Sequence, residues 1–115
     1  MGLATLKGRT SFKRILASGQ RRRSDGITVY CGLNGTEANR YGVMVSAKAG
    51  CAVVRSRVRR WARALLRSWD TALDAGYDVV VYANRPEAAQ GYALFAGHLA
   101  AALKQHHLAE GGLEY

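Results

Sequence analysis

Residues 52–67 read AVVRSRVRRWARALLR, with six arginines within thirteen positions and no acidic residue. On a helical projection at about 100° per residue, most of the basic side chains gather on one arc about 140° wide. This arc holds Arg55, Ser56, Arg59, Arg60, Arg63 and Arg67. The opposite side is an apolar stripe of Val54, Val58, Trp61, Ala62, Leu65, Leu66 and Trp69. The pattern predicts a helix that is buried on one side and cationic on the other.

The cationic arc differs from an ordinary solvated helix face. Four of its arginines repeat at i,i+4, a spacing at which like charges destabilise a helix. A polyanion relieves that repulsion, and arginine side chains match phosphate oxygens bidentately. Asp70 and Asp74 turn the same arc acidic at its far end, and Arg57 stands outside it at about 200°. We therefore expect a bounded surface that binds nucleic acid.

The whole composition agrees with a small basic domain. The 115 residues carry a formal net charge of +9 and a pI of about 10.2, which favours a polyanionic partner. The length predicts a single RNA-binding domain over residues 1–115, with residues 1–9 loosely held. No apolar run approaches the roughly 20 residues of a membrane span, and no secretion signal is evident. Cys31 and Cys51 are too few for a disulfide framework or a four-ligand zinc site, so we expect a cytoplasmic protein.

Two further helices are expected on either side of the arginine helix. Thr10 or Ser11 can cap a short helix that runs to about Ala17. The arginine helix should extend from about Ala52 to Ala75, where Gly76 ends it. The last helix should run from about Glu87 to His107, because apolar side chains recur there at helical spacing. They are Tyr92, Phe95, Leu99 and Leu103.

Three segments have the pattern of strands. Residues 27–33 and 41–46 alternate in polarity, and Asn34-Gly35 opens a turn, so we expect a hairpin. Residues 77–83 are almost wholly apolar, which predicts a central strand covered on both faces. Residues 20–25 fit either a loop or a short edge strand. These elements predict an α+β sandwich with one mixed sheet.

Residues 47–63, AKAGCAVVRSRVRRWAR, resemble the signature of the protein subunit of bacterial ribonuclease P. The matching positions are Gly50, Ala52, Val53, Arg55, Arg57, Arg59, Arg60 and Arg63. Residues 6–19, 27–33, 41–46 and 77–86 resemble the family's other elements in the same order. The central Asn of the signature is Ser56 in this chain, and a second aromatic residue of the first helix is Leu16.

The resemblance implies an α-β-β-β-α-β-α fold with a mixed four-stranded sheet and a left-handed βαβ crossover. It implies a subunit of an endoribonuclease holoenzyme in which the RNA subunit, using Mg²⁺, removes the 5′ leader of precursor tRNA. The implied partners are the catalytic RNA and that leader, with no membrane and no obligatory protein partner.

The resemblance also implies two sets of binding residues. The surface for the catalytic RNA comprises Lys48, Arg55, Ser56, Arg57, Arg59, Arg60, Arg63 and Arg67. Phe12 and Tyr30 are expected in a cleft that holds the single-stranded leader. Aromatic faces stack on unpaired bases without reading sequence, which suits many different leaders. Phe12 fits equally well as a core anchor of its helix. The basic residues at 13–14 and 21–23 fit contacts with RNA phosphates, and they fit solvated charges at least as well.

A catalytic site on the protein itself is not expected. His98, His106 and His107 lie on or after the last helix, and no His-x-x-x-His or Cys-x-x-Cys spacing occurs. We therefore expect Mg²⁺ to bind through the RNA and not through protein side chains alone. The alternative functions are a non-catalytic basic RNA-binding protein of ribosomal or RNA-chaperone type and, third, a basic helix that docks on anionic membrane.

Overall fold

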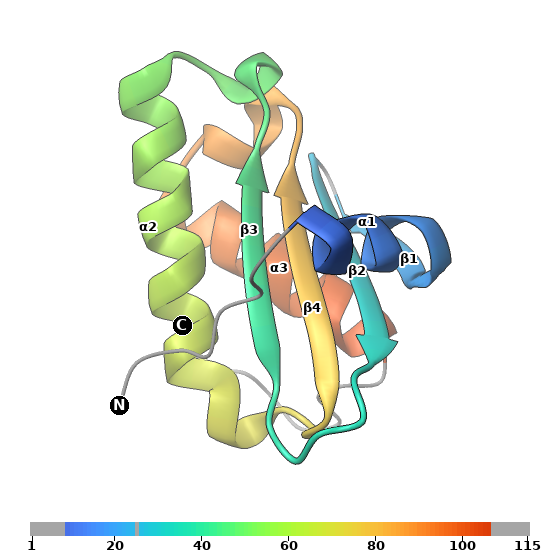
Figure 1. Ribbon diagram of the computed structural model, residues 1–115. Coiled ribbons are helices and arrows are strands. Elements are labelled where there is room, and N and C mark those ends of the chain that lie inside the picture. Colours follow the sequence, from blue (N-terminus) through green and yellow to red (C-terminus); the bar gives the residue numbers. More distant parts are fainter. Residues whose placement is uncertain (1–8, 25, 107–115) are drawn as a thin grey trace.

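The computed structural model describes residues 9–24 and 26–106, and Figure 1 shows their arrangement. The helices are α1 (Arg9–Ser18), α2 (Ala52–Trp69) and α3 (Tyr92–Gln105). The strands are β1 (Gln20–Ser24), β2 (Ile27–Leu33), β3 (Arg40–Val45) and β4 (Tyr77–Ala83). Short 3-10 turns are η1 (Ala47–Ala49), η2 (Asp70–Ala72) and η3 (Pro86–Ala89). The α-β-β-β-α-β-α order is confirmed, and residues 20–24 form a strand.

The four strands form one mixed sheet in the order β1-β2-β4-β3. β4 lies antiparallel to β2 and parallel to β3. The expected hairpin between residues 27–33 and 41–46 is therefore wrong. Val79, Val80 and Val81 of β4 have no exposed surface because helices cover both faces of this strand, and β4 separates β2 from β3. Its predicted central place is confirmed.

The connection from β3 through α2 to β4 is a left-handed crossover. Figure 1 shows both strands pointing up, with β4 to the right of β3 and α1 toward the viewer. α2 packs on the opposite face of the sheet, where Val58 and Leu65 share a core with Val79 and Val81. Parallel crossovers are right-handed in about 98% of cases. The rare hand implied by the family resemblance is therefore present.

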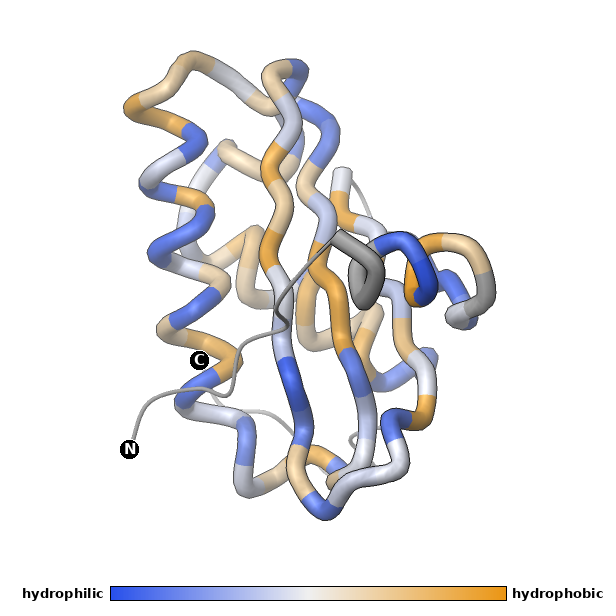
Figure 2. The backbone as a smooth tube through the Cα atoms, in the orientation of Figure 1, coloured by the Kyte–Doolittle hydropathy of each residue, from blue (hydrophilic) through white to orange (hydrophobic). Residues whose placement is uncertain are grey.

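The helices cover the two sheet faces unequally. α2 and α3 bury one face together in a large apolar core that includes Ile27, Val29 and Phe95. α1 crosses β2 and β4 on the other face, where Ile15 and Val80 form a small separate cluster. Figure 2 shows the apolar stretch along the middle of β4 and the mixture of polar and apolar residues along α2. Much of the α1 face is left for polar and aromatic side chains.

Two helix boundaries differ from the sequence prediction. α2 ends at Trp69 instead of Ala75, because residues 70–72 tighten into η2 and Leu73 turns extended into the core. Tyr41 donates a hydrogen bond to the Asp70 carboxylate at this point. The last helix begins at Tyr92 instead of Glu87, since Gly91 separates it from η3. His107 and residues 1–8 lie outside the described residues, and Arg9 begins α1.

Candidate nucleic-acid interface

The predicted two-sided character of α2 is confirmed. Its buried residues are Val58, Ala62, Leu65, Leu66 and Trp69, all from the apolar stripe. Val54 and Trp61 are half-buried and pack against the same core. On the other side Arg57, Arg60, Arg63 and Arg67 are exposed, and Arg55 and Arg59 are half-buried. Among the described residues, none of these six arginines has a carboxylate within 4.0 Å. The helix therefore presents uncompensated positive charge to solvent.

Two hollows run along this cationic side. One of about 400 Å³ is lined by Ser56, Arg59, Arg60, Arg63, Ala64 and Arg67. The other, of about 380 Å³, is lined by Ala52, Val53, Ser56, Arg57 and Arg60. Ser56 and Arg60 belong to both, so the two hollows adjoin each other on α2. Arg57, which the helical projection sets apart, thus joins the same surface from its other edge.

Ser56 helps to arrange the arginines around it. Its hydroxyl accepts a hydrogen bond of 3.2 Å from Nη2 of Arg59, three residues along the helix. The Nε of Arg55 is buried and has no hydrogen-bond partner among the described residues. A guanidinium held by its neighbours loses less conformational freedom when it binds a phosphate. The surface is therefore partly preorganised.

The turn before α2 requires the glycine of the signature. Gly50 has a φ of 153°, and a Cβ there would lie 2.7 Å from Cγ1 of Val54. Ser46 caps η1 by accepting from the backbone N–H of Lys48, whose side chain is exposed. Lys48 thus lies in η1, in the turn that leads into α2. Cys51 is the exposed N-cap residue, and the backbone N–H groups of Val54 and Val53 at the start of the helix lower the pKa of its thiol.

Tyr30 lies on the sheet face that α1 covers, as its alternation predicts. It is half-buried against the cluster of Ile15 and Val80, together with Met44. The side chain of Leu16, on α1, is 36% exposed. Phe12 falls within α1, but its side chain lies outside the part that the structure describes. The structure thus shows Tyr30 among apolar neighbours on this face, and a leader-binding cleft there, with its contribution from Phe12, stays a prediction.

Sequence reasoning missed Asp78, a fully buried carboxylate on the same face. Arg40 donates to it twice, from Nε to Oδ1 at 2.7 Å and from Nη2 to Oδ2 at 2.9 Å. Asn34 donates to Oδ1 at 3.1 Å, and Nη2 of Arg14 lies 3.5 Å from Oδ2. Arg14 comes from α1, so this network fixes that helix on the sheet. The available signal was one acidic residue inside an apolar strand.

The described residues hold no group of three or more His, Cys, Asp or Glu side chains placed to bind a metal ion. The three helices in that part of the chain also include none with the length and apolar character needed to cross a membrane. The candidate interface is therefore described by the arginines of α2, the two hollows beside them and the half-buried Tyr30 on the α1 face.

The comparisons with known proteins agree with one another. A family model described as Ribonuclease P matches residues 2–107. The ribonuclease P protein component of Caldanaerobacter subterraneus is 39% identical over 82 residues, covering 71% of each chain. The solved RNase P protein of Staphylococcus aureus matches with a TM-score of 0.83 at 25% identity, over 90% of this chain and 95% of that one. The solved RNase P protein of Thermotoga maritima matches with a TM-score of 0.79 at 26% identity, over 87% of this chain and 97% of that one.

Proposed function

The chain belongs to the ribonuclease P protein family, and we propose that it binds the catalytic RNA of that endoribonuclease through α2 and the 5′ leader of precursor tRNA through the cleft under α1. The protein is a component of the holoenzyme, and the RNA subunit carries the chemistry. The observation that supports RNA binding most directly is the cationic side of α2. Its six arginines have no carboxylate partner among the described residues.

The α2 surface suits the backbone of a folded RNA. Arginine forks bind phosphate oxygens without reading sequence, and folded RNA is recognised largely by its shape. Four to six neutralised phosphates give a slope of log K against log salt of about −3 to −5. Most of the affinity for the catalytic RNA is then electrostatic. Lys48 extends this contact from the turn before the helix.

The cleft under α1 suits a single strand. Tyr30 offers a half-buried ring beside Ile15, Val80 and Met44, and Phe12 is expected to add a second ring from α1. Stacking of one base on an aromatic ring contributes about 1–3 kcal/mol and tolerates any sequence. Leader recognition of this kind accepts many different precursors.

Mg²⁺ belongs to the RNA in this proposal. Bound to RNA oxygens, it supplies the activation of water for hydrolysis of the phosphodiester. The role of the protein is to hold the two RNA molecules against each other and lower their mutual repulsion. We also propose that it acts in the cytoplasm as a single domain without an obligatory protein partner. Cys31 and Cys51 are free thiols, as is usual in a reducing compartment.

A reconstitution assay tests the function. The protein is mixed with a bacterial ribonuclease P RNA at low Mg²⁺, and cleavage of a precursor tRNA with a long leader is followed. We expect a clear stimulation over RNA alone, with a smaller one for a precursor whose leader is cut short. The absence of stimulation for both precursors would overturn the proposal.

A further inference from the structure

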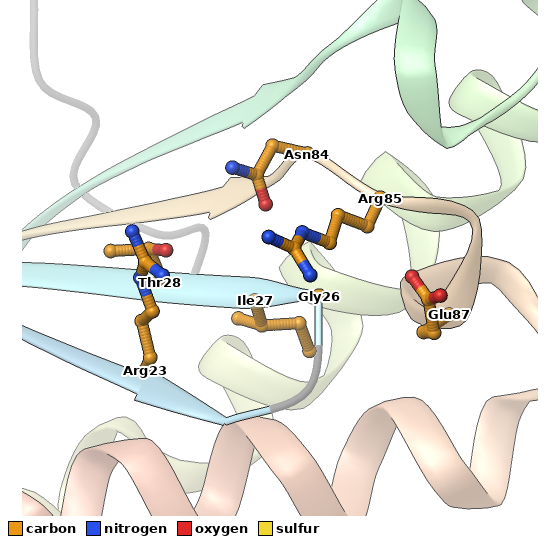
Figure 3. Close-up of a pocket in the computed structure, with 7 residues that line it drawn as sticks. All are labelled: Arg23, Gly26, Ile27, Thr28, Asn84, Arg85 and Glu87. Carbon is orange, nitrogen blue, oxygen red and sulfur yellow. The ribbon is translucent and has the colours of Figure 1, made fainter.

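A polar pocket lies at one end of the sheet, on the α1 face, and Figure 3 shows it closely. Its volume is about 350 Å³, and its lining comprises Arg23, Gly26, Ile27, Thr28, Asn84, Arg85 and Glu87. These residues come from the end of β1, the start of β2 and the link from β4 to η3. The same end of the sheet carries η1 and the start of α2. The pocket is therefore near the RNA-binding surface without being part of it.

The pocket is shaped by a close approach of two loops. Gly26 has a φ of 78°, and a Cβ there would lie 2.9 Å from the backbone nitrogen of Ala88. The backbone N–H of Asn84 donates to the carbonyl of Gly26 at 3.1 Å. The positive φ and the close approach to Ala88 both exclude a side chain at position 26. The turn between β1 and β2 is thus held against η3, which fixes the two basic walls relative to each other.

The lining is rich in hydrogen-bond donors. Arg23 and Arg85 are exposed, and among the described residues neither has a carboxylate within 4.0 Å. Figure 3 shows Arg23 rising beside Thr28 and Arg85 extending toward Asn84 and Gly26, with Glu87 farther along the turn. Two guanidinium groups, an amide and a hydroxyl match the oxygens of a phosphate. The carboxylate of Glu87 opposes that binding.

Strand register places the pocket on the same sheet face as Tyr30. Arg23 pairs with Thr28, and Thr28 pairs with Tyr82, so these three side chains share the face that carries Tyr30. Thr28 and Tyr30 are two residues apart on β2, which is about 7 Å along the strand. An extended single strand crosses that distance in one nucleotide step. The pocket therefore lies where a single-stranded RNA with one base stacked on Tyr30 would continue along the sheet.

We propose that this pocket is a phosphate subsite for the leader, in which Arg23 and Arg85 bind one phosphodiester group of the strand that leaves the cleft. The inference rests on the proposed function, since it needs a single strand on the α1 face. Glu87 limits the affinity, which keeps the leader exchangeable after cleavage. A leader too short to reach the pocket gains nothing from it.

Leader length provides the test. The affinity of the reconstituted holoenzyme is measured for precursor tRNAs whose leaders lengthen one nucleotide at a time. The wild-type protein should gain affinity at one particular length. Arg23→Ala/Arg85→Ala should lose that gain and bind long leaders at least about tenfold more weakly. Loss of one phosphate contact should also make the salt slope for long leaders shallower by about 0.7.

The matched control removes two positive charges from the other side of the molecule. Arg22 pairs with Val29, whose side chain faces α3, and Lys104 is exposed on α3 itself. Arg22→Ala/Lys104→Ala should keep the gain with leader length. Glu87→Gln should strengthen binding of long leaders only, because it removes the opposing charge.

Two results would overturn the subsite. One is a pocket variant that keeps the gain with leader length. The other is an equal loss at every length, which would assign the bound phosphate to the catalytic RNA. A wild-type protein that stimulates no cleavage would instead remove the proposed function itself, so the two failures are distinguishable.

Discussion

The guanidinium of Arg40 binds the carboxylate of Asp78 in a bidentate pair, with N···O distances of 2.7 and 2.9 Å. Asp78 is fully buried on β4, whereas the Arg40 side chain on β3 keeps 34% of its surface exposed. The pair therefore joins the two parallel strands at the end of the sheet where both begin. The same carboxylate accepts a hydrogen bond from the side-chain amide of Asn34 and lies beside the guanidinium of Arg14 on α1. One buried charge thus holds three segments.

This asymmetry predicts an order of stability losses. Asp78→Asn should lower the free energy of unfolding by about 1–3 kcal/mol, because charge-assisted hydrogen bonds are lost but Arg40 can still reach water. Arg40→Ala should cost more, since it leaves a buried carboxylate without its main partner. Urea unfolding followed by tryptophan fluorescence measures both. Equal losses, or a greater loss for Asp78→Asn, would contradict the account.

The cationic side of α2 makes a prediction about salt. Arg59→Ala/Arg63→Ala should weaken binding to the catalytic RNA and make the slope of log K against log salt shallower by about 1.5–2. Both side chains point away from the core, so the unfolding free energy should change by less than about 1 kcal/mol. Filter binding over a salt series checks the slope. An unchanged slope would place the RNA contact elsewhere on the protein.

Ser56 is the position where the chain departs from the family signature. Ser56→Asn places an amide, which can donate and accept, where the two hollows of α2 meet. We expect the affinity for the catalytic RNA to rise by about two- to tenfold. Ser56→Ala should lower it slightly, because Arg59 loses its hydroxyl partner. The affinity for the catalytic RNA must change in opposite directions in the two variants, while their thermal stability stays unchanged.

Alkaline pH should destabilise the protein through two buried groups. Burial, with a smaller effect of the Asp78 charge, raises the pKa of the Cys31 thiol from 9.0 to about 12. Burial and the hydrogen bond to Asp70 raise the pKa of Tyr41 above its ordinary value of 10.0. The unfolded chain releases these protons first, so stability is lost as pH rises above 9.0 for Cys31 and above 10.0 for Tyr41, by up to about 1.4 kcal/mol per pH unit for each group.

Urea unfolding between pH 8 and 11 checks this effect. Cys31→Ala should flatten the loss of stability with pH, whereas Cys51→Ala, at an exposed site, should leave it unchanged. The same fall in both variants would show that neither thiol is responsible.

The two thiols should also differ in reactivity. Cys51 is exposed with a lowered pKa, and Cys31 is buried with a raised one. Ellman's reagent at neutral pH should therefore modify one thiol rapidly and the second only in denaturant. Because Cys51 adjoins the α2 surface, bound catalytic RNA should slow the fast reaction. Equal rates for the two thiols would contradict the structure.

The sequence predicted the parts of this fold that depend on local patterns. The apolar stripe of α2 recurs at helical spacing, and β4 is apolar on both faces except at Asp78. Each pattern fits only one environment. Strand order is different, because Asn34-Gly35 marks a turn without specifying which strand follows it in space. The pairing of β3 with β4 depends on contacts across the length of α2, and no local pattern encodes them.

The candidate site divides in the same way. The helical projection located the arginine arc and set Arg57 apart from it. The family resemblance included Arg57 in the binding surface, and the structure places it beside the neighbouring hollow. Tyr30 was placed on the correct face by alternation. The role of Asp78 depends on Arg40 and Asn34, which lie 38 and 44 residues away in the chain. The pocket at Gly26 likewise requires two distant turns to meet.

The central position of β4 has a consequence for the order of synthesis. β2 and β3 leave the ribosome first, but each borders β4 and they do not pair with each other. Until residues 77–83 follow, neither strand has its main partner, and α2 lacks most of the core that orders it. A nascent chain that stops before Tyr77 should therefore be an unfolded polycation and not a smaller domain. Folding must wait for a late, non-local contact, which makes it slow relative to a helical bundle of this size.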